Sequence, residues 1–421
     1  MAIHDEICRS IDRFKDKATS LGRQIHAHPE LKFEERFAAG LLADALGELG
    51  VEVERGVAGL ETAFRAEVGK FGNSGKSGSS GKSSKSDRSD KSDKSGKSDE
   101  SDRSAPTVAI LAEYDALPNG HSCGHNLICT AALSAFAGLA AIKDQLPGRV
   151  VILGTPAEEG GGGKIIMLEK GAMKDVDAAM MAHPLDGEFA TFPALATRHL
   201  RLTFHGHASH ASVAPWAGAS ALSAVIQTFQ SVDAARLHFR DGSRIHGIIS
   251  NGGQAVNIIP EKAECEFLCR AHSTGYTHEI AGRVLRCAEA AAAATGTRLE
   301  HEILGGYKNM INNLAMAHRY ARHCESFGVK APDAPRDLPT GSTDMGDVSH
   351  ALPAIHPVFR IADPGAGNCH EERFARHTDT PRGYEAMIRV AKAMALTVYD
   401  LLAEPALIES AKREFAARQE N

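Results

Sequence analysis

The segment EYDALPNGHSCGHN, residues 113–126, joins two apolar runs of different character. The run before it, Thr107 to Leu111, predicts a buried strand, and the Ala/Leu-rich run after it, Leu127 to Ile142, predicts a helix. Cys123 and His125 are one residue apart at the carboxyl end of that strand, so both can reach one metal ion; thiolate and neutral imidazole are the preferred ligands of zinc. The alternative is a buried Cys beside a His that caps the helix, because free Cys is often a core residue.

Length and composition indicate a cytoplasmic, globular protein. A chain of 421 residues is too long for one compact core, so two domains are expected. The formal charge of −6 gives no electrostatic case for a nucleic-acid partner, and no run approaches the ~20 apolar residues that span a membrane. The amino terminus lacks the pattern of a signal peptide. The eight cysteines show no framework spacing, so we expect reduced thiols, one or two of them ligands.

Predicted strands alternate with predicted helices at both ends of the chain. The first 49 residues carry apolar residues at helical spacing, interrupted at HAHPE, residues 26–30, by the conformational restriction that Pro29 imposes. The further predicted strands are Val51–Val53, Thr62–Val68, Arg149–Thr155, Ala178–Ala182 and His356–Ile361, and the further helices are Ile165–Lys170, Leu314–Phe327 and Tyr384–Leu402. This alternation predicts an α/β fold, with a mostly parallel sheet flanked by helices.

The composition changes abruptly at residues 70–104, which are rich in Ser, Lys, Asp and Gly. Such a segment cannot bury enough apolar surface to offset its ordering entropy, so we expect it to be disordered. It falls between two predicted strands and is interpreted as an enlarged hairpin loop. A docking tail is the alternative, but the charges alternate with only a small basic excess, which favours a passive insert.

Residues 193–305 have a different pattern. Arg198 to Phe204 alternates apolar and polar residues, as expected of a half-exposed strand. The remaining predicted elements are helices Ala217–Phe239 and Thr277–Ala294 and strands Gly247–Ser250, Val256–Ile259, Ala263–Arg270 and Arg298–Ile303. This order predicts an inserted α+β, ferredoxin-like domain, which divides the other domain into residues 1–192 and 306–421.

Potential metal ligands and a further carboxylate follow successive strands of the larger domain. In open parallel sheets, ligands bind beyond the carboxyl ends of the strands, so these side chains are expected to converge. They are Cys123, His125, Glu158, Glu159, His183 and His370. A cluster of this size suits two metal ions bridged by water, with one of two adjacent glutamates acting as general base.

Each of these residues also has an ordinary structural interpretation. Glu158 and Glu159 could only favour the positive end of the following helix. The glycine run before Lys164 resembles a phosphate loop, but Ile165 stands where Ser or Thr is required, so that interpretation fails. His183 could terminate a strand, and His370 could be an unremarkable loop residue. Their joint occurrence at strand ends favours metal binding.

Several long motifs occur along the chain: EYDALP at 113–118, CGHNLI at 123–128, GTPAEEGGGG at 154–163, VDAAMMAHP at 176–184, ASHA at 208–211 with PW at 215–216, and GSTDMGDVS at 341–349. Together they resemble the two-metal aminoacylase/carboxypeptidase family of metallopeptidases, and within it p-aminobenzoyl-glutamate hydrolases and dipeptidases of β-alanyl-lysine-type substrates. The resemblance covers nearly everything except the Ser/Lys/Asp insert.

This resemblance implies a zinc-peptidase-like catalytic domain with an inserted lid and dimerisation domain, and hence a homodimer. It implies metal ligation by Cys123, His125, Glu159, His183 and His370. Glu158 would activate the bridging water, and Asp115 would orient a ligand.

The resemblance also implies residues that contact the substrate. His210 stands where a histidine reaches across the dimer to the substrate carbonyl, a contact worth ~3 kcal/mol of barrier. Asn257 precedes an Ile-Pro turn and would contact the substrate backbone. Arg270, Gly341 and Ser342 are also expected to bind substrate, although a strand-edge Arg is as often merely solvated.

Two departures from the family pattern affect the site. Many members carry a His-x-Asp pair where this chain has Glu113-Tyr114-Asp115, so one metal would rely on Cys123, which favours zinc and makes the site oxidisable. Ser122 and the Asn119-Gly120 turn also differ, which leaves the geometry of the loop around Cys123 open.

These features predict a metal-dependent amidohydrolase or dipeptidase with two divalent ions, zinc or alternatively manganese. A metal-bridging hydroxide would attack the amide of a small N-acyl amino acid or dipeptide. One alternative is a deacylase of N-acyl amino acids with a bulky acyl group. Another, of a different class, is a metal-free scaffold that binds partners through its charged insert.

Overall fold

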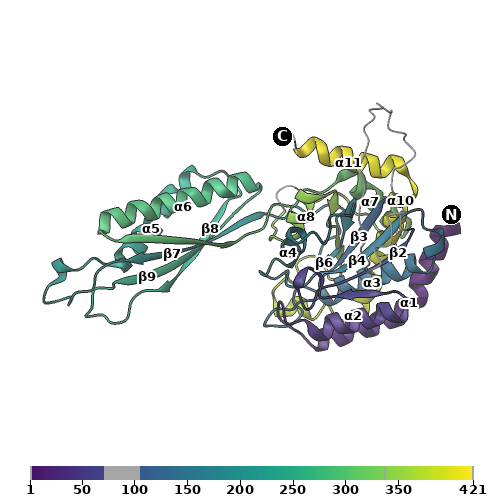
Figure 1. The fold of residues 1–421 in the computed structure, drawn as a ribbon, viewed down its shortest axis with the longest axis horizontal. Coiled ribbons are helices and arrows are strands. Elements are labelled where there is room, and N and C mark those ends of the chain that lie inside the picture. Colours follow the sequence, from purple (N-terminus) through teal and green to yellow (C-terminus); the bar gives the residue numbers. More distant parts are fainter. Residues whose placement is uncertain (1, 71–104, 336–337, 420–421) are drawn as a thin grey trace, which may run out of the picture.

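The computed structural model describes residues 2–70, 105–335 and 338–419. It has two lobes, and Figure 1 shows the smaller one extending away from the larger. The larger lobe contains both ends of the described chain. No helix in the described part is long and apolar enough to cross a membrane. The predicted domain boundaries at 192/193 and 305/306 stay a prediction.

The larger lobe is built on a six-stranded sheet with the order β1-β2-β4-β3-β5-β11. Its strands are β1 (Val53–Arg55), β2 (Phe64–Gly69), β3 (Thr107–Ala112), β4 (Arg149–Gly154), β5 (Ala178–Met180) and β11 (Ala354–Ile355). The last four are mutually parallel, and β1 and β2 are antiparallel additions at one edge. A separate parallel pair consists of β6 (His183–Leu185) and β12 (Val358–Arg360). The predicted α/β class with a mostly parallel sheet is confirmed.

The connection from β2 to β3 is not a hairpin, so that prediction is wrong. β4 lies between the two strands, antiparallel to β2 and parallel to β3. The physical reason is that β4 is a central strand: its residues 150–153 are buried on both faces, as is typical of such a strand, and its backbone pairs along both edges. The predicted disorder of the insert concerns residues 71–104, which lie outside the described residues.

Helices cover both faces of this sheet. In β3, Val108 and Ile110 pack in one core, and Ala109 and Leu111 pack in another, as the two-residue period of a strand requires. The helices of the first core are α1 (Ala2–Ala27), α2 (Arg36–Glu48), α3 (His125–Ala140), α7 (Leu314–Ser326), α10 (Pro381–Ala403) and α11 (Pro405–Gln419). The second core takes α4 (Gly163–Glu169) and α8 (Met345–Ala351), and a short helix, α9 (Glu372–Ala375), precedes α10.

The smaller lobe is a four-stranded antiparallel sheet in the order β10-β7-β9-β8. Its elements are β7 (Ala196–His205), α5 (Ala221–Ala235), β8 (Arg244–Asn251), β9 (Lys262–Ala271), α6 (Thr274–Thr295) and β10 (Arg298–Gly305). Both helices pack on one face of this sheet, which confirms the ferredoxin-like expectation (Figure 1). The strand predicted at Val256–Ile259 is wrong: this largely exposed segment forms a turn with one isolated bridge, between Ile258 and His210.

Candidate metal centre

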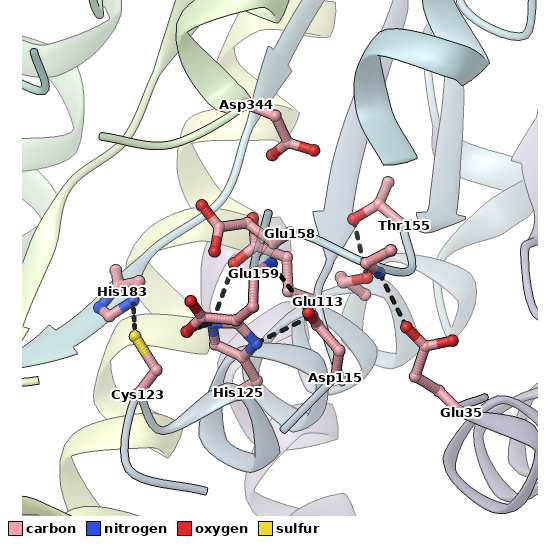
Figure 2. A network of polar contacts seen from close by, with 12 residues as sticks. Glu35, Glu113, Asp115, Cys123, His125, Thr155, Glu158, Glu159, His183 and Asp344 are labelled. Carbon is pink, nitrogen blue, oxygen red and sulfur yellow. Dashed lines mark hydrogen bonds and ion pairs between the residues drawn. The ribbon is translucent and has the colours of Figure 1, made fainter. Parts of the chain in front are cut away.

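The six predicted side chains come together beyond the carboxyl ends of the parallel strands. Asp115 follows β3, and Cys123 and His125 lie at the start of α3. Glu158 and Glu159 follow β4, and His183 is the first residue of β6. Figure 2 shows these side chains turned toward one another from separate loops. His370 reaches the same cluster from the segment before α9.

The distances between potential ligand atoms fit metal coordination. Cys123 Sγ lies 3.5 Å from His183 Nε2. The ligand atoms of Cys123, Glu159 and His370 lie within 4.8 Å of one another, as do those of His125, Glu158 and Glu159. Cys123 and Glu159 therefore connect neighbouring sets of ligands, which a pair of ions requires.

Asp115 and Pro184 fix the orientation of two of the imidazoles. Asp115 Oδ1 lies 3.1 Å from His125 Nδ1, and its other oxygen accepts a hydrogen bond from the Glu159 N–H. The Nδ1 atom of His183 lies 2.8 Å from the Pro184 carbonyl oxygen. In both histidines Nε2 then remains the atom directed into the cluster. His125 Nε2 is buried and has no hydrogen-bond partner among the described residues.

The segment around Asn119 and Ser122, whose geometry the sequence left open, holds His370 in place. Asn119 donates a hydrogen bond to the His370 carbonyl oxygen, and the His370 N–H donates to the Ser122 carbonyl oxygen. His370 has a left-handed backbone with φ of +72°. Such a conformation costs roughly 1 kcal/mol in a non-glycine residue, and these two contacts stabilise it.

Contacts from distant residues also fix the loop that carries Glu158. Ala157 has φ of +60°, and its N–H donates to Glu35, a buried carboxylate at the start of α2. The Tyr307 hydroxyl donates to the Glu158 carbonyl oxygen at 2.6 Å. The Glu35 contact is visible in Figure 2. This support matters because a general base must be held within hydrogen-bond reach of its proton.

Carboxylates outnumber cations in the buried part of the cluster. The ammonium group of Lys164, which is fully buried, contacts Glu113 and lies 2.7 Å from Asp344 Oδ1. Oxygens of Glu113, Glu158 and Asp344 lie within 4.8 Å of one another. Burial, with repulsion from Glu113 and Glu159, raises the pKa of Glu158 well above its usual range. Burial and the positive field of His125 lower the pKa of His183 to about 3, which keeps it in the neutral form that binds metals.

The predicted substrate residues are divided between two places. Arg270 Nη1 donates a hydrogen bond of 2.9 Å to Ser342 Oγ, and the neighbouring Gly341 carbonyl accepts from the Leu195 N–H, so these residues line the junction of the lobes. Burial lowers the pKa of Arg270. It makes no ion pair with a carboxylate in the part of the chain that the structure describes.

His210 and Asn257 lie in the smaller lobe, away from its junction with the larger lobe. The Asn257 carbonyl accepts a hydrogen bond from the Ala211 N–H, so the two segments form one exposed tip beyond the end of β7. The other end of β7 lies at the junction of the lobes, where the Thr197 N–H donates to the Tyr307 carbonyl. At about 3.3 Å per residue, the strand separates the tip from the cluster by roughly 30 Å. The chain does not bring its own His210 to its own candidate metal ligands.

The sequence pattern of peptidase family M20/M25/M40 matches residues 109–393. The chain belongs to this family. It is 34% identical to the Xaa-Arg dipeptidase of Mus musculus, over 97% of this chain and 91% of the relative. It is 30% identical to one of the p-aminobenzoyl-glutamate hydrolase subunits of Escherichia coli (strain K12), over 96% and 93% of the two chains.

Solved structures of similar fold include other M20 proteins. A dinuclear metal-binding M20 peptidase from Bacillus subtilis has a TM-score of 0.67 at 18% identity, over 93% of this chain and 99% of the other. An aminobenzoyl-glutamate utilization protein from Klebsiella pneumoniae has a TM-score of 0.68 at 19% identity, over 93% and 97%. These likenesses show the fold. Family membership confirms the prediction of a metal-dependent hydrolase of amide or peptide bonds, and the metal-free scaffold is not retained.

The residues of this M20 peptidase fit two divalent ions. The donors are a thiol, imidazoles and carboxylates, the types that zinc and related ions bind. The buried Nε2 of His125 has no hydrogen-bond partner in the described chain, which fits an atom that binds a metal ion, since buried polar groups normally have a partner.

Sequence reasoning missed several residues of this centre. Cys369 Sγ lies within 4.8 Å of the ligand atoms of Cys123 and His183. His356 is buried against His183, with ring centroids 5.7 Å apart, and neither of its ring nitrogens has a hydrogen-bond partner in the described chain. The adjacency of Cys369 to His370 was a usable signal. Lys164 and Glu35 gave none, because their roles depend on contacts between distant segments.

Proposed function

We propose that Cys123, His125, Glu159, His183 and His370 hold two divalent ions at which the amide bond of a small N-acyl amino acid or dipeptide is hydrolysed. The observation that carries this proposal is that these donors fall into neighbouring sets linked by Cys123 and Glu159, each set with its ligand atoms within 4.8 Å of one another. When bound, the ions would polarise the substrate carbonyl and lower the pKa of a water molecule. The sulfur ligand favours zinc as the resident metal, with manganese as the alternative. The cytoplasm is the expected compartment.

Glu158 is the proposed general base. Its carboxylate lies within 4.8 Å of ligand atoms of His125 and Glu159 but pairs with no lysine or arginine in the described chain. It takes a proton from the attacking water and then delivers that proton to the leaving amine. Asp115 keeps His125 in the tautomer and orientation that leave Nε2 available.

Arg270 and Ser342 are proposed to bind the substrate carboxylate next to Gly341. The Arg270 guanidinium is half-buried, bonded to the Ser342 hydroxyl, and lacks a carboxylate partner in the described chain. A planar guanidinium can accept a carboxylate in two parallel hydrogen bonds. A free α-carboxylate next to the scissile amide would form an ion pair with the Arg270 guanidinium. This favours a small substrate over a folded protein.

A homodimer is proposed because the smaller lobe offers both an open edge and displaced substrate residues. β8 is an edge strand on which Ile248 is 64% exposed, and an apolar edge of this kind favours pairing with another chain. In such a dimer the partner's tip would supply the equivalents of His210 and Asn257. A hydrogen bond from His210 to the developing oxyanion is the proposed role.

The relatives suggest two acyl–amino acid combinations to test. One is a dipeptide that ends in arginine or lysine, as in the Xaa-Arg dipeptidases, and the other is p-aminobenzoyl-glutamate. A deacylase of amino acids with bulky acyl groups remains the alternative, and a panel that includes both dipeptides and long-chain N-acyl amino acids separates them.

The test of the catalytic assignment is Glu158→Gln. The substitution keeps the shape of the side chain but removes the proton acceptor, so kcat should fall about 10³-fold, within the range typical of general bases. The metal content should equal that of the wild type. Glu61→Gln, which alters an exposed carboxylate paired with Arg36, is the control and should leave kcat unchanged. Full turnover by the Glu158 variant would disprove the assignment.

A further inference from the structure

A second thiol, that of Cys369, lies beside the candidate metal centre. Its Sγ atom, Cys123 Sγ and a ring nitrogen of His183 all lie within 4.8 Å of one another. Cys123 and His183 are buried or nearly so, and Cys369 is half-buried. Two thiols and an imidazole at this spacing form a set of ligands that the five proposed residues do not account for.

The spacing matches tetrahedral zinc coordination. With Zn–S bonds of about 2.3 Å and Zn–N bonds of about 2.0 Å, a sulfur and a nitrogen on one zinc ion are separated by roughly 3.5 Å. Cys123 Sγ and His183 Nε2 are 3.5 Å apart. Two sulfurs on one zinc ion are separated by roughly 3.8 Å, a distance within the 4.8 Å limit that relates Cys369 Sγ to Cys123 Sγ.

The backbone around Cys369 explains how two consecutive side chains reach one cluster. Neighbouring side chains normally diverge, but the left-handed conformation of His370 bends the chain immediately after Cys369. The turn is closed by a hydrogen bond from the Glu371 N–H to the Asn368 carbonyl. The contacts of His370 with Asn119 and Ser122 attach it to the loop that carries Cys123. Both thiols are thus held by one network.

We propose that Cys369 is a metal ligand, so that Cys123, His183 and Cys369 bind one ion in a position with two sulfur donors. The proposal rests on the proposed function, because it assumes that the centre holds metal. On binding, each thiol loses its proton to solvent and forms a coordinate bond from sulfur to the ion. Glu159 and His370 form a second set with Cys123 and offer the other ion a harder set of donors.

A position with two thiolates should differ from its neighbour in metal preference. The sulfur-rich position prefers zinc over manganese, because thiolate is a soft ligand and manganese prefers oxygen. The two positions therefore differ in metal preference, and zinc should occupy the sulfur-rich one first.

Cobalt substitution tests the proposal directly. Chelator-treated full-length protein is titrated with Co²⁺, and the sulfur-to-cobalt charge-transfer band in the near ultraviolet is recorded for the wild type and for Cys369→Ser, Cys123→Ser and Cys287→Ser. Cys287 lies on α6 in the smaller lobe and serves as the control. We expect Cys369→Ser to lose about half of the band intensity and Cys287→Ser to lose none.

Alkylation provides a second readout that needs no variant. Zinc should slow the reaction of Cys369 with iodoacetamide at least about tenfold, as followed by peptide mass spectrometry, because a metal-bound thiolate is a poor nucleophile. The rate at Cys287 should not change. If the protein binds two equivalents of cobalt while Cys369→Ser keeps the full band and zinc leaves Cys369 reactive, the proposal is wrong and the proposed function stands. If the wild type binds no metal, both are wrong.

Discussion

Two buried ionic clusters lie in the larger lobe, and they differ in how their charges are balanced. Around Asp400 on α10, one carboxylate oxygen lies 2.9 Å from His4 Nε2, and the other accepts hydrogen bonds from Arg319 and His323 at 2.6 and 2.7 Å. The cations that this carboxylate needs come from the chain itself. This cluster joins α1, α7 and α10.

In the cluster beyond β3 and β4, the buried carboxylates are not matched by an equal number of lysine or arginine side chains of the described chain. Lys164 is the buried lysine between Glu113 and Asp344, while Glu158 and Glu159 are left with histidines as their nearest basic groups. Burying carboxylates without partners is costly, so a stable fold retains them only where a cation from outside completes the set. Burial of charge is common to both clusters, and the lack of charge balance is what favours the second cluster as the proposed metal centre.

The largest expected effect comes from removing the internal cation of the unbalanced cluster. Lys164→Met should lower the free energy of unfolding by about 4 kcal/mol, because it leaves two buried carboxylates without their shared partner. Urea denaturation of the metal-free protein measures this. The matched control is Lys412→Met, which removes a half-exposed partner of Asp177 and should cost about 0.5 kcal/mol. Equal effects of the two substitutions would contradict the comparison.

Loss of the carboxylate that orients His125 should weaken metal binding without removing a ligand. We expect Asp115→Asn to lower metal affinity about 10- to 100-fold, up to ~2.7 kcal/mol, because the histidine loses its fixed orientation. Competition with a chromophoric chelator gives the affinity. Asp177→Asn, at the opposite end of the sheet, is the control, and an unchanged affinity in Asp115→Asn would argue against the orienting role.

The balanced cluster should affect stability alone. Burial by itself would raise the pKa of Asp400, but hydrogen bonds from His323 and Arg319 lower it to about 2. Because this pKa is below that of the unfolded chain, near 4, the stabilisation is complete at neutral pH and is lost as the pH falls from about 4 toward 2. Asp400→Asn should therefore cost ~2 kcal/mol at pH 7 and progressively less in acid. A change in metal stoichiometry in this variant would show that the clusters are not independent.

The smallest effect is expected at an exposed pair on the smaller lobe. Asp233 on α5 and Arg236, the residue that follows this helix, form a contact of 2.7 Å, with both side chains about half exposed. Asp233→Asn should change the free energy of unfolding by only ~0.3 kcal/mol, because solvent screens the pair. Thermal denaturation is sufficient to check it, and a loss above 1 kcal/mol would show that charge balance matters outside buried clusters too.

Local patterns in the sequence predicted much of this molecule. Continuous apolar runs located β3 and β4, and the polar segments that follow these strands pointed to Cys123, His125, Glu158 and Glu159 as candidate site residues. The alternation of predicted strands and helices in residues 193–305 predicted the ferredoxin-like order of the smaller lobe. These features depend on residues close together in the chain.

The rest depends on which distant segments become neighbours. Period-two patterns do not specify strand order, so the insertion of β4 between β2 and β3 was not foreseen. Lys164 was correctly rejected as a phosphate-binding lysine, but its role as the cation between Glu113 and Asp344 requires knowledge of three separate loops. His210 was expected to act from a partner, and its position far from the metal ligands of its own chain leaves that role a prediction.

The most direct test of the central claim is the metal content of the full-length protein after chelation and reloading with zinc. We expect two ions per chain in the wild type, two in Asp400→Asn, and no more than one in His183→Ala, because only the last removes a ligand. Elemental analysis gives the count. Fewer than one ion in the wild type, or two in a double variant that lacks both His183 and His370, would contradict the claim that the unbalanced cluster is a two-metal centre.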